Sequence, residues 1–512
     1  MTADVVAAGA QGLHAGTPPA PCVVVIFGAS GDLARRELIP ALFELERHAL
    51  LPEQFAVVGF SNADWTDEQF RDVMQEKVRQ HCAFDEARWR HFGPRLYYVK
   101  GDFRAPPDQD YARLASKLVA VRAEQRIGDN VLVHLATPPM FFDVITQRLA
   151  AAGLAHSADG WRRIVVEKPF GVDEASSRAL NASIARVFAE DQVYRIDHFL
   201  GKETVQNMLV VRFANPSFEP IWNRNYIDHV QITVAEDIGI GTRGRFYERT
   251  GVVRDMVQNH LLQLVCMTAI EPPGRFEGTS LRNETAKVLE AICAVDVNAD
   301  CVSGQYGSGT IAGTAVPGYR SEDAVTADSI TPTYAAVRLM IDNWRWAGVP
   351  FYLRTGKRLS SRLTEVAIQF KPTPHLMFPV DRSALASNVL VFRLQPQEGI
   401  RQRFVAKRPG PGLEMRAVDM SFRYATTFGM KELPPAYAWL LLDAMQGDQT
   451  LFARSDWIAR AWQIVDPIVS RWEERAAAAF PNYTAGSTGP DAAAALLARD
   501  GRTWLPLGIP DR

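Results

Sequence analysis

A short apolar segment, followed at once by a glycine loop and a helical pattern, constrains the fold more than any other feature. Residues 22–27 read Cys-Val-Val-Val-Ile-Phe and lie between Pro21 and Gly28. A continuous run of β-branched residues with turn residues at both ends is typical of a strand buried on both faces of a parallel sheet. From Leu33 onward, apolar residues recur with helical spacing. The segment therefore predicts a strand, a loop and a helix, which together begin an α/β fold.

The same alternation of strands and helices continues as far as residue 166. The expected strands cover residues 55–60, 96–100, 130–136 and 163–166, and the expected helices between them cover residues 67–80 and 111–126. Strands that alternate with helices favour a right-handed, doubly wound parallel sheet. We therefore expect an α/β, Rossmann-like N-terminal domain, with the strand at 163–166 closing the series.

The pattern changes after residue 200. Strands are expected at residues 230–235, 365–371, 388–395 and 417–423, and helices at residues 252–268, 434–445 and 455–476. This mixture is typical of an α+β domain with a mainly antiparallel sheet. The predicted division is a flexible tail (1–20), a first domain (21–197) and a second, larger domain (198–512). The functional cleft is expected between the two domains, and the residues from 485 onward are expected to be peripheral.

Composition narrows the class of protein. The chain has 512 residues, of which 47% are hydrophobic and 22% charged, and its formal net charge is -2. This balance is typical of a globular protein and excludes a globally basic nucleic-acid binder. No apolar run approaches the roughly 20 residues that cross a bilayer, and the N-terminus lacks a signal-peptide pattern. The five cysteines form no CxxC and no metal-ligand spacing with histidine, so we expect thiols in a reducing cytoplasm and no metal site.

The loop Gly28-Ala29-Ser30-Gly31-Asp32-Leu33 lies between the first strand and the first helix. A dinucleotide pyrophosphate requires close approach of the backbone, which glycine permits, and free N–H groups at a helix N-terminus. The full GxGxxG spacing is missing, because Ile26 occupies the first glycine position. The loop therefore predicts a dinucleotide site, and a tight structural turn is the alternative.

Two later segments carry candidate catalytic groups. Lys168 follows a predicted buried strand directly and would lie at the carboxyl edge of the sheet, where doubly wound folds bind ligands. The alternative is a solvated loop lysine, and Pro169 can be a cis turn residue. His260 lies among Gln258 and Asn259 on an otherwise apolar helix, and its imidazole suits a general base near neutral pH. The alternative is a hydrogen-bonded core histidine.

Basic residues predict a phosphate site. His198 and Lys202 are four residues apart, so on a helix they would share a face and could bind a phosphate dianion. Asp197 cannot pair with His198, its neighbour, and needs a histidine from elsewhere. Lys357 and Arg362 belong to a second basic cluster. For both clusters the alternative is a solvated charged surface.

The joint pattern resembles the glucose-6-phosphate dehydrogenase family over roughly residues 22 to 490. The matching runs, in chain order, are GASGDLA, EKPFG, RIDHFLGKE, VRFAN, IWNRN, RDMVQNHLLQ, GQY, GYR and GVPFYLRTGKRL. The resemblance implies oxidation of C1 of glucose 6-phosphate to 6-phosphoglucono-1,5-lactone, with hydride transfer to NADP or NAD, as the first step of the pentose phosphate pathway. It also implies a first domain that binds the dinucleotide, a second that binds the sugar phosphate, and a homodimer or homotetramer.

The resemblance also implies residue roles. His260 is similar to the family's general base, Asp197 to the carboxylate that orients it, and Lys168 to the lysine between sugar and nicotinamide. The residues similar to sugar-phosphate ligands are Lys168, His198, Phe199, Lys202, Glu236, Asp255, Lys357 and Arg362. The residues similar to dinucleotide ligands are Gly28, Ser30, Gly31, Asp32, Leu33, Arg35, Asn62, Pro138 and Lys168.

Three positions depart from the family pattern. Glu37 stands where a third basic residue usually reaches the active site, which raises the alternative of a different aldose or aldose phosphate. Asn62 replaces the arginine that reads the 2′-phosphate of NADP, so NAD is also possible, and Arg35 or Arg36 could substitute. Thr488 replaces an arginine of the second, structural NADP site of eukaryotic members, and we expect no such site. A non-catalytic dinucleotide-binding homologue is the third hypothesis, and the presence of Asp197, Lys168 and His260 argues against it.

Overall fold

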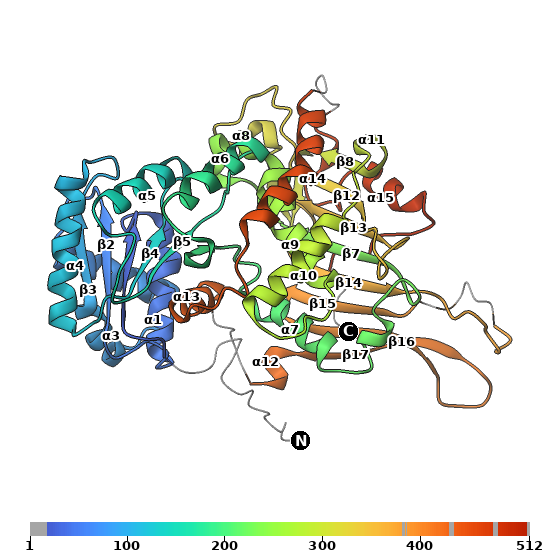
Figure 1. Cartoon of the computed structure of the whole chain (residues 1–512). Helices are drawn as coiled ribbons and strands as arrows, with labels where there is room; N and C mark the ends of the chain where they lie inside the picture. Colours follow the sequence, from blue (N-terminus) through green and yellow to red (C-terminus); the bar gives the residue numbers. More distant parts are fainter. Residues whose placement is uncertain (1–17, 381–384, 386, 430–434, 475–479, 509–512) are drawn as a thin grey trace. The chain divides into compact units, whose positions relative to one another are not determined.

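The computed structural model describes residues 18–380, 385, 387–429, 435–474 and 480–508. The chain divides into two compact units (Figure 1). Unit 1 runs to residue 201 and includes residues 273–284 and 434–459, whereas unit 2 comprises residues 202–272, 285–433 and 460–512, each within the described residues. Only the last three residues of the predicted tail are described. No helix among the described residues is long and apolar enough to cross a membrane.

Unit 1 contains a parallel sheet of six strands in the order β3-β2-β1-β4-β5-β6. The strands are β1 (Cys22–Phe27), β2 (Phe55–Ser61), β3 (Leu96–Lys100), β4 (Val131–Leu135), β5 (Arg162–Val166) and β6 (Val193–Arg195). All residues of β1, β2 and β4 are buried, as expected for strands covered on both faces. The predicted doubly wound parallel sheet is confirmed. The expectation that residues 163–166 close the series is wrong, because three-residue β6 follows and is too short to show a pattern.

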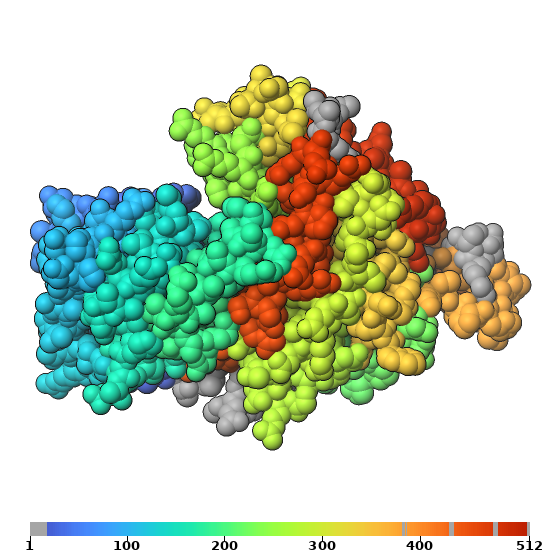
Figure 2. Space-filling view, turned by 45° about the horizontal axis from the view of Figure 1, so that its top comes forward, coloured from blue at the N-terminus to red at the C-terminus, as the bar shows by residue number. Residues whose placement is uncertain are grey.

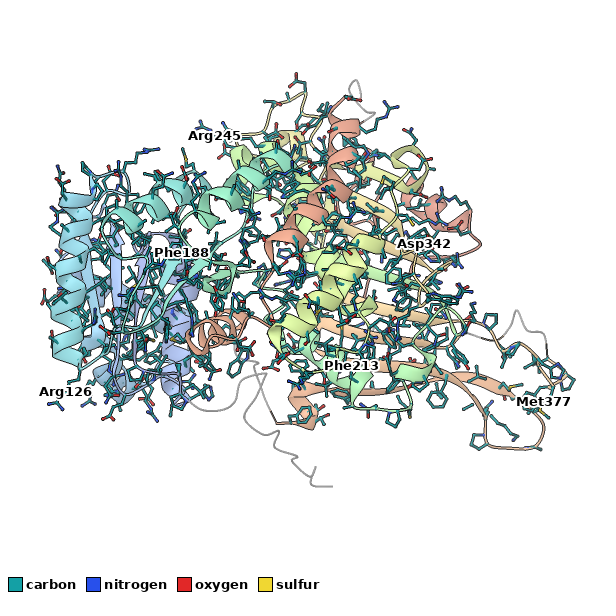
Figure 3. The ribbon with its side chains drawn as sticks, in the orientation of Figure 1. Arg126, Phe188, Phe213, Arg245, Asp342 and Met377 are labelled. Atoms are coloured by element: carbon teal, nitrogen blue, oxygen red, sulfur yellow. The ribbon has the colours of Figure 1, made fainter. Side chains whose placement is uncertain are left out.

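Helices cover the sheet of unit 1. They are η1 (Ala34–Leu38), α1 (Ile39–Arg47), α2 (Asp67–His81), α3 (Glu86–Phe92), α4 (Ala112–Gln125), α5 (Phe142–Ala151), α6 (Glu174–Ala185) and α13 (Ala436–Gln446). Thr66 forms a capping box with Gln69 at the start of α2, and Arg126 ends α4 with a left-handed φ of 55° (Figure 3). Figure 2 shows α4, α5 and α6, coloured light blue to green, over one face of this unit. The predicted helix at 434–445 starts two residues later in the described chain.

Unit 2 is built on a mixed sheet of eight strands in the order β17-β16-β15-β14-β7-β13-β12-β8. The strands are β7 (Ile227–Ala235), β8 (Cys301–Gly304), β12 (Tyr334–Met340), β13 (Pro350–Gly356), β14 (Leu363–Phe370), β15 (Val389–Gln395), β16 (Gly399–Lys407) and β17 (Met415–Arg423). All neighbouring pairs are antiparallel except β7 with β13. The predicted α+β unit with a mainly antiparallel sheet is confirmed. Small pairs join β10 (Gly309–Ile311) to β11 (Thr314–Val316), and β9 (Tyr306–Gly307) to β18 (Tyr483–Thr484).

The helices of unit 2 include one π-helical segment. The helices are α7 (Glu203–Phe213), α8 (Gly244–Val252), η8 (Val253–Leu261), α9 (Leu262–Ala269), α11 (Val297–Asp300), α12 (Tyr424–Thr427) and α15 (Asp491–Ala498). Two more, α10 (Gly278–Ala291) and α14 (Ser455–Glu473), contribute residues to both units. The predicted helix at 252–268 is therefore two segments, of which the first is a π-helix. Residues 475 and 476 of the predicted last long helix lie outside the described residues.

The C-terminal residues are part of the core of unit 2. Leu496 and Leu497 are buried together with Tyr334 and Tyr483. Farther along, the Leu505 N–H donates to Gln231 Oε1 at 2.8 Å on β7. The expectation that the residues from 485 onward are peripheral is wrong. The Ala-rich sequence gives no sign of this packing. A helix of small side chains has no clear apolar and polar faces, although such side chains let the helix lie close to its neighbours.

Candidate active site

The glycine loop has the geometry of a dinucleotide site. Gly28 has φ +84°, and a Cβ there would lie 2.3 Å from the Ala136 carbonyl oxygen. The Gly28 N–H donates to the Phe60 carbonyl at 2.8 Å, and the Gly31 N–H donates to the Gly28 carbonyl at 2.8 Å. The loop therefore passes the ends of β2 and β4 at distances that only glycine permits, immediately before the helix made by η1 and α1. These residues fit a bound pyrophosphate.

Near the end of β2, an arginine of η1 lies over an aromatic ring. The Arg35 guanidinium lies over the Trp65 ring, 5.2 Å from its centroid. Asn62 is exposed, and Asp64, the acid near this strand end, pairs with Lys100 at 2.9 Å. Ser61 donates to Ser30 Oγ at 2.9 Å, which links the strand end to the glycine loop. Of the remaining predicted dinucleotide ligands in this unit, Asp32 and Pro138 are exposed and Leu33 is partly buried.

The carboxyl edge of β5 carries a buried group of polar side chains that sequence reasoning missed. Glu167 accepts from the Tyr437 hydroxyl at 3.2 Å, and its other oxygen lies 3.4 Å from His134 Nε2. Burial raises the pKa of Glu167 to about 8 and lowers the pKa of His134 to about 3. Glu167 precedes Lys168 directly, which is the one local signal that could have identified it. Tyr437 has no such signal, because it lies 270 residues away in sequence.

Lys168 and Asp197 lie near this group. Lys168 is partly buried, and the Lys168–Pro169 bond is cis, so the cis turn expected as an alternative is present. The Lys168 charge lowers the pKa of Glu167, whereas the charges of Asp197 and Glu37 raise it. Glu37 itself has an exposed side chain, and partial desolvation raises its pKa. The charge of Glu37 nevertheless raises the pKa of Glu167, which lies at the edge of the sheet beside Lys168.

The segment after β6 is a turn. Asp197 is 2% exposed and accepts from the Phe199 N–H at 3.0 Å, and the Leu200 N–H donates to the Asp197 carbonyl at 3.0 Å. The His198 and Phe199 rings lie 5.1 Å apart. Helix α7 starts only at Glu203, after Lys202. His198 and Lys202 therefore do not share a helical face, because the turn at Asp197 precedes the helix.

Unit 2 gathers a second set of predicted residues around Tyr247. Lys357 is 2% exposed, and its Nζ pairs with Glu236 Oε2 at 2.6 Å. The same Nζ lies 5.2 Å from the centroid of the Tyr247 ring. Burial raises the pKa of Tyr247, and the charges of Asp255 and Glu236 raise it further. Tyr247 is another residue that sequence reasoning missed. Arg362, by contrast, is exposed at the start of β14.

The π-helix η8 carries both Asp255 and His260. His260 is 1% exposed, whereas Asp255 is partly exposed. Asp255 and His260 are five residues apart on η8, a segment in which backbone hydrogen bonds join residue i to residue i+5. Isolated π-turns of this kind are frequent at functional sites.

Comparison with known proteins gives consistent matches over nearly the whole chain. Residues 25–207 match the family model described as "Glucose-6-phosphate dehydrogenase, NAD binding domain", and residues 209–505 match its C-terminal domain. The chain is 46% identical over 492 residues to a glucose-6-phosphate 1-dehydrogenase of Aggregatibacter actinomycetemcomitans, covering 95% of this chain and 98% of the relative. It is 44% identical over 490 residues to "Glucose-6-phosphate 1-dehydrogenase 2" of Mycobacterium tuberculosis, covering 94% of each.

Solved structures agree with these sequence matches. A glucose-6-phosphate dehydrogenase in complex with its substrate glucose 6-phosphate superimposes with a TM-score of 0.88 at 33% identity, covering 96% of this chain and 100% of that chain. The glucose-6-phosphate 1-dehydrogenase of Mycobacterium avium gives a TM-score of 0.80 at 37% identity, covering 97% of this chain and 100% of that chain.

Proposed function

Because this chain belongs to the glucose-6-phosphate dehydrogenase family, we propose that it oxidises C1 of glucose 6-phosphate to 6-phosphoglucono-1,5-lactone. The observation that carries the proposal is 46% identity over 95% of the chain to an enzyme of that name. A nicotinamide dinucleotide, when bound, accepts the hydride that leaves C1. The reaction is the entry step of the pentose phosphate pathway.

His260 acts as the general base. Its neutral imidazole takes the proton from the C1 hydroxyl oxygen as the C1–H bond breaks, and Asp197 stabilises the imidazolium that forms. The burial of both side chains supports this assignment, because a shielded carboxylate and imidazole interact more strongly than exposed ones. Lys168 donates to a substrate oxygen and holds the sugar near the dinucleotide.

Two groups of residues are assigned to the sugar phosphate. We assign the phosphate to His198, Lys202 and Arg362, with the Phe199 ring beside it. Glu236, Asp255 and Lys357 bind the sugar hydroxyls, and the Lys357–Glu236 ion pair of 2.6 Å supports this role because it holds the two side chains together. The buried Tyr247 ring lies beside this pair, with its centroid 5.2 Å from Lys357 Nζ.

We assign NADP as the preferred dinucleotide, bound by the glycine loop and by Ser30, Asp32, Leu33 and Pro138. The Arg35 guanidinium over Trp65 supports this choice, since an arginine near the end of β2 can accommodate a 2′-phosphate. The nearby acid Asp64 is already paired with Lys100, so it is poorly placed to bind a free ribose hydroxyl. Asn62 carries no charge, and NAD is therefore expected as a slower second substrate.

Glu37 favours a second candidate, a dehydrogenase for another aldose or aldose phosphate. Its charge acts on Glu167, beside Lys168, and a negative charge there weakens the binding of a phosphate dianion.

The proposal also includes that the protein is a homodimer or a homotetramer and that it is located in the cytoplasm.

Initial rates with glucose 6-phosphate test the function, with NADP and NAD measured side by side. Turnover that is faster with NADP is expected, and equal rates with unphosphorylated glucose would reject the phosphate assignment.

Replacing His260 by Asn tests the base. We expect turnover to fall by about 10²–10⁴-fold, the range typical of a general base, while the dissociation constant of glucose 6-phosphate changes little. Gln258→Ala, a change on the same helix, serves as the control for local packing. Unchanged turnover in His260→Asn would rule out the mechanism.

A further inference from the structure

A buried tyrosine of α8, Tyr247, lies beside two of the residues assigned to the sugar hydroxyls. The Tyr247 side chain is 0% exposed and Lys357 is 2% exposed. Lys357 Nζ lies over the Tyr247 ring, 5.2 Å from its centroid, and 2.6 Å from Glu236 Oε2. An ammonium within about 6 Å of a ring centroid is attracted by the negative face of the ring, most strongly where water is excluded. The buried ammonium therefore has two partners, a carboxylate and a ring.

Hydrogen bonds fix the backbone around this ion pair. The Lys357 N–H donates to the Thr333 carbonyl at 3.1 Å, and the Tyr483 hydroxyl donates to the Lys357 carbonyl at 2.8 Å. The Glu236 N–H donates to the Gly356 carbonyl at 2.9 Å. The flexible part of the pair is therefore the lysine side chain, whose four-carbon stem has many rotamers. The contacts of the ammonium decide which of these rotamers is populated.

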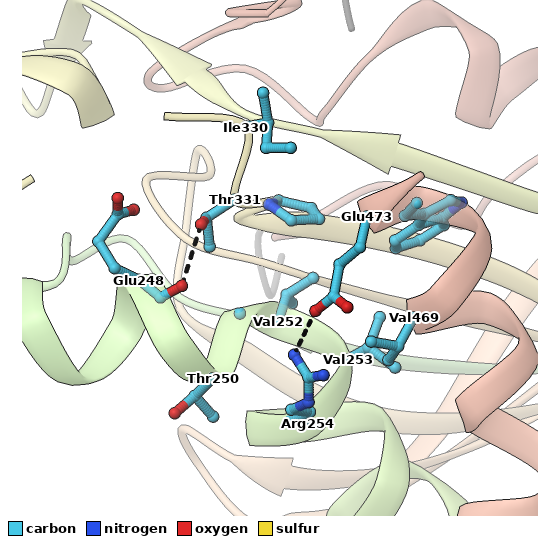
Figure 4. A pocket seen from close by; sticks show the side chains of 12 residues that line it. Glu248, Thr250, Val252, Val253, Arg254, Ile330, Thr331, Val469 and Glu473 are labelled. Atoms are coloured by element: carbon cyan, nitrogen blue, oxygen red, sulfur yellow. Dashed lines mark hydrogen bonds and ion pairs between the residues drawn. The ribbon is translucent and has the colours of Figure 1, made fainter. Parts of the chain in front are cut away.

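The Tyr247 ring is itself held in place. The Tyr319 ring packs edge-on against it, with the two centroids 6.1 Å apart, and the Tyr319 hydroxyl donates to Glu248 Oε1 at 2.6 Å. Figure 4 shows the bond that fixes the next turn of α8, from Thr331 Oγ1 to the Glu248 carbonyl, at 3.3 Å. The ring is therefore a rigid surface on which the ammonium rests.

The two contacts restrict the directions in which Lys357 can bind a substrate. A lysine ammonium has three N–H donors. One of them donates to Glu236 Oε2, and the Tyr247 ring occupies a second side of the ammonium. A remaining donor is free to bind a sugar hydroxyl from a fixed position, which lowers the entropy that binding would otherwise cost. Loss of the ring would release the lysine stem into other rotamers.

We propose that Tyr247 is a positioning residue, which holds the Lys357 ammonium in the orientation that binds the sugar. The proposal rests on the proposed function, because it requires Lys357 to contact the sugar phosphate. The ring performs this task, and not the hydroxyl, which has no hydrogen-bond partner among the described residues. Phenylalanine should therefore replace Tyr247 without loss, whereas a side chain without an electron-rich ring should not.

Calorimetric titration of the full-length protein with glucose 6-phosphate tests the proposal. Tyr247→Phe should change the dissociation constant less than twofold, whereas Tyr247→Leu should raise it roughly tenfold. Pentafluorophenylalanine at position 247 has nearly the shape of phenylalanine but an electron-poor face, so it should weaken binding at least fivefold even if the leucine variant fails to fold. Tyr306→Leu removes another buried ring of the same core, whose hydroxyl donates to Glu322, and should change the constant less than twofold.

A double-mutant cycle shows whether Tyr247 acts through Lys357. In the Lys357→Met background, Tyr247→Leu should weaken glucose 6-phosphate binding less than twofold. The same cycle on denaturation midpoints without ligand should also be non-additive, because the ring and the ammonium are in contact in the free protein. A tenfold loss that persists in the Lys357→Met background, or equal binding by the phenylalanine and pentafluorophenylalanine variants, would overturn the positioning role. A wild-type protein that does not bind glucose 6-phosphate would instead overturn the proposed function.

Discussion

At the scale of single residues, the carboxyl edge of the parallel sheet in unit 1 is rich in acids. Glu167 is buried between His134 and Tyr437, and the charges of Asp197 and Glu37 both raise its pKa. With a pKa of about 8, Glu167 is mostly protonated at neutral pH and can donate a hydrogen bond. In its protonated form Glu167 adds no second negative charge beside Asp197.

Replacing Glu167 by Gln should change the pH dependence of stability. The pKa of Glu167 is about 8 in the folded chain and near 4.5 when unfolded. Between these values only the unfolded chain loses the proton, so the contribution of Glu167 to wild-type stability falls as pH rises from 4.5 to 8. Glutamine keeps the hydrogen-bonding shape without titrating. His134 titrates in both proteins, so the comparison is between them: relative to the wild type, the denaturation midpoint of Glu167→Gln should increase from pH 5 to pH 8.

The control for this comparison is Glu414→Gln. The exposed carboxyl of Glu414 has a lowered pKa, because Arg408 and Arg416 donate to it, so it does not titrate in this interval. The variant should keep the wild-type pH dependence. A pH dependence of Glu167→Gln equal to that of the wild type would show that Glu167 is ionised in the folded protein.

Glu37→Lys should lower the Michaelis constant for glucose 6-phosphate. The change replaces a negative charge that reaches the Lys168 region by a positive one. Two unit charges about 5 Å apart interact by roughly 3 kcal/mol at an effective dielectric constant near 20, so a change of tenfold or more is expected. Glu37→Gln should give an intermediate value. Initial-rate kinetics would contradict this if all three proteins had the same constant.

At the scale of elements, the junction of α8 and η8 organises the site half in unit 2. Gly251 allows the break, and η8, which follows it, carries Asp255 and His260. The π-helix could not be predicted, because a helical hydrophobic pattern does not distinguish a π-helix from an α-helix over nine residues. The strand at 96–100 was predicted with its observed ends, since Gly101 and the apolar run define it.

Gly251→Ala should destabilise unit 2 and reduce turnover. The φ of +59° with ψ of 175° lies in a region that is essentially restricted to glycine, and an alanine there costs on the order of 1–3 kcal/mol. Because η8 begins at the next turn, realignment of His260 should lower turnover as well. Thermal melting and initial rates measure the two effects. Gly128→Ala, where nothing lies within 4 Å of the new methyl group, is the matched control, and equal melting of the two variants would refute the strain.

Sequence patterns point to catalytic candidates more readily than to the groups that lie around them. Lys168, Asp197 and His260 stand in runs with strong local patterns, and the structure places each at the end of a strand or on the predicted helix. Tyr247 lies beside the predicted residue Lys357, and Tyr437 donates to Glu167, which the sequence did not mark; both tyrosines come from distant segments without a local pattern. Contacts of this kind depend on the tertiary fold, which a single sequence does not reveal.

At the scale of the whole molecule, the end of the chain completes unit 2. Trp504 Nε1 donates to the Ala493 carbonyl at 2.8 Å, and Arg502 pairs with Asp228 of β7 at 2.8 Å. These bonds connect the segment after α15 both to α15 itself and to the central sheet. The same sheet carries Lys357 directly after β13 and Glu236 directly after β7. The C-terminal segment therefore supports strands that position substrate-binding candidates.

Removal of residues 491–512 should unfold unit 2 or lower its melting temperature strongly. Leu496 and Leu497 are at most 4% exposed, and each fully buried leucine contributes about 1.5–3 kcal/mol. Their combined loss, about 3–6 kcal/mol, reaches the lower end of the roughly 5–15 kcal/mol that typically stabilises a folded domain. The single change Leu497→Ala isolates one contact and should cost about 2–5 kcal/mol. Leu413→Ala, at a position 40% exposed between β16 and β17, should cost less than about 0.5 kcal/mol. Denaturant titration of these variants provides the comparison. If Leu497→Ala were as stable as Leu413→Ala, the C-terminal helix would be dispensable for the core, and the support it gives to β7 and β13 would have to come from the loops around them.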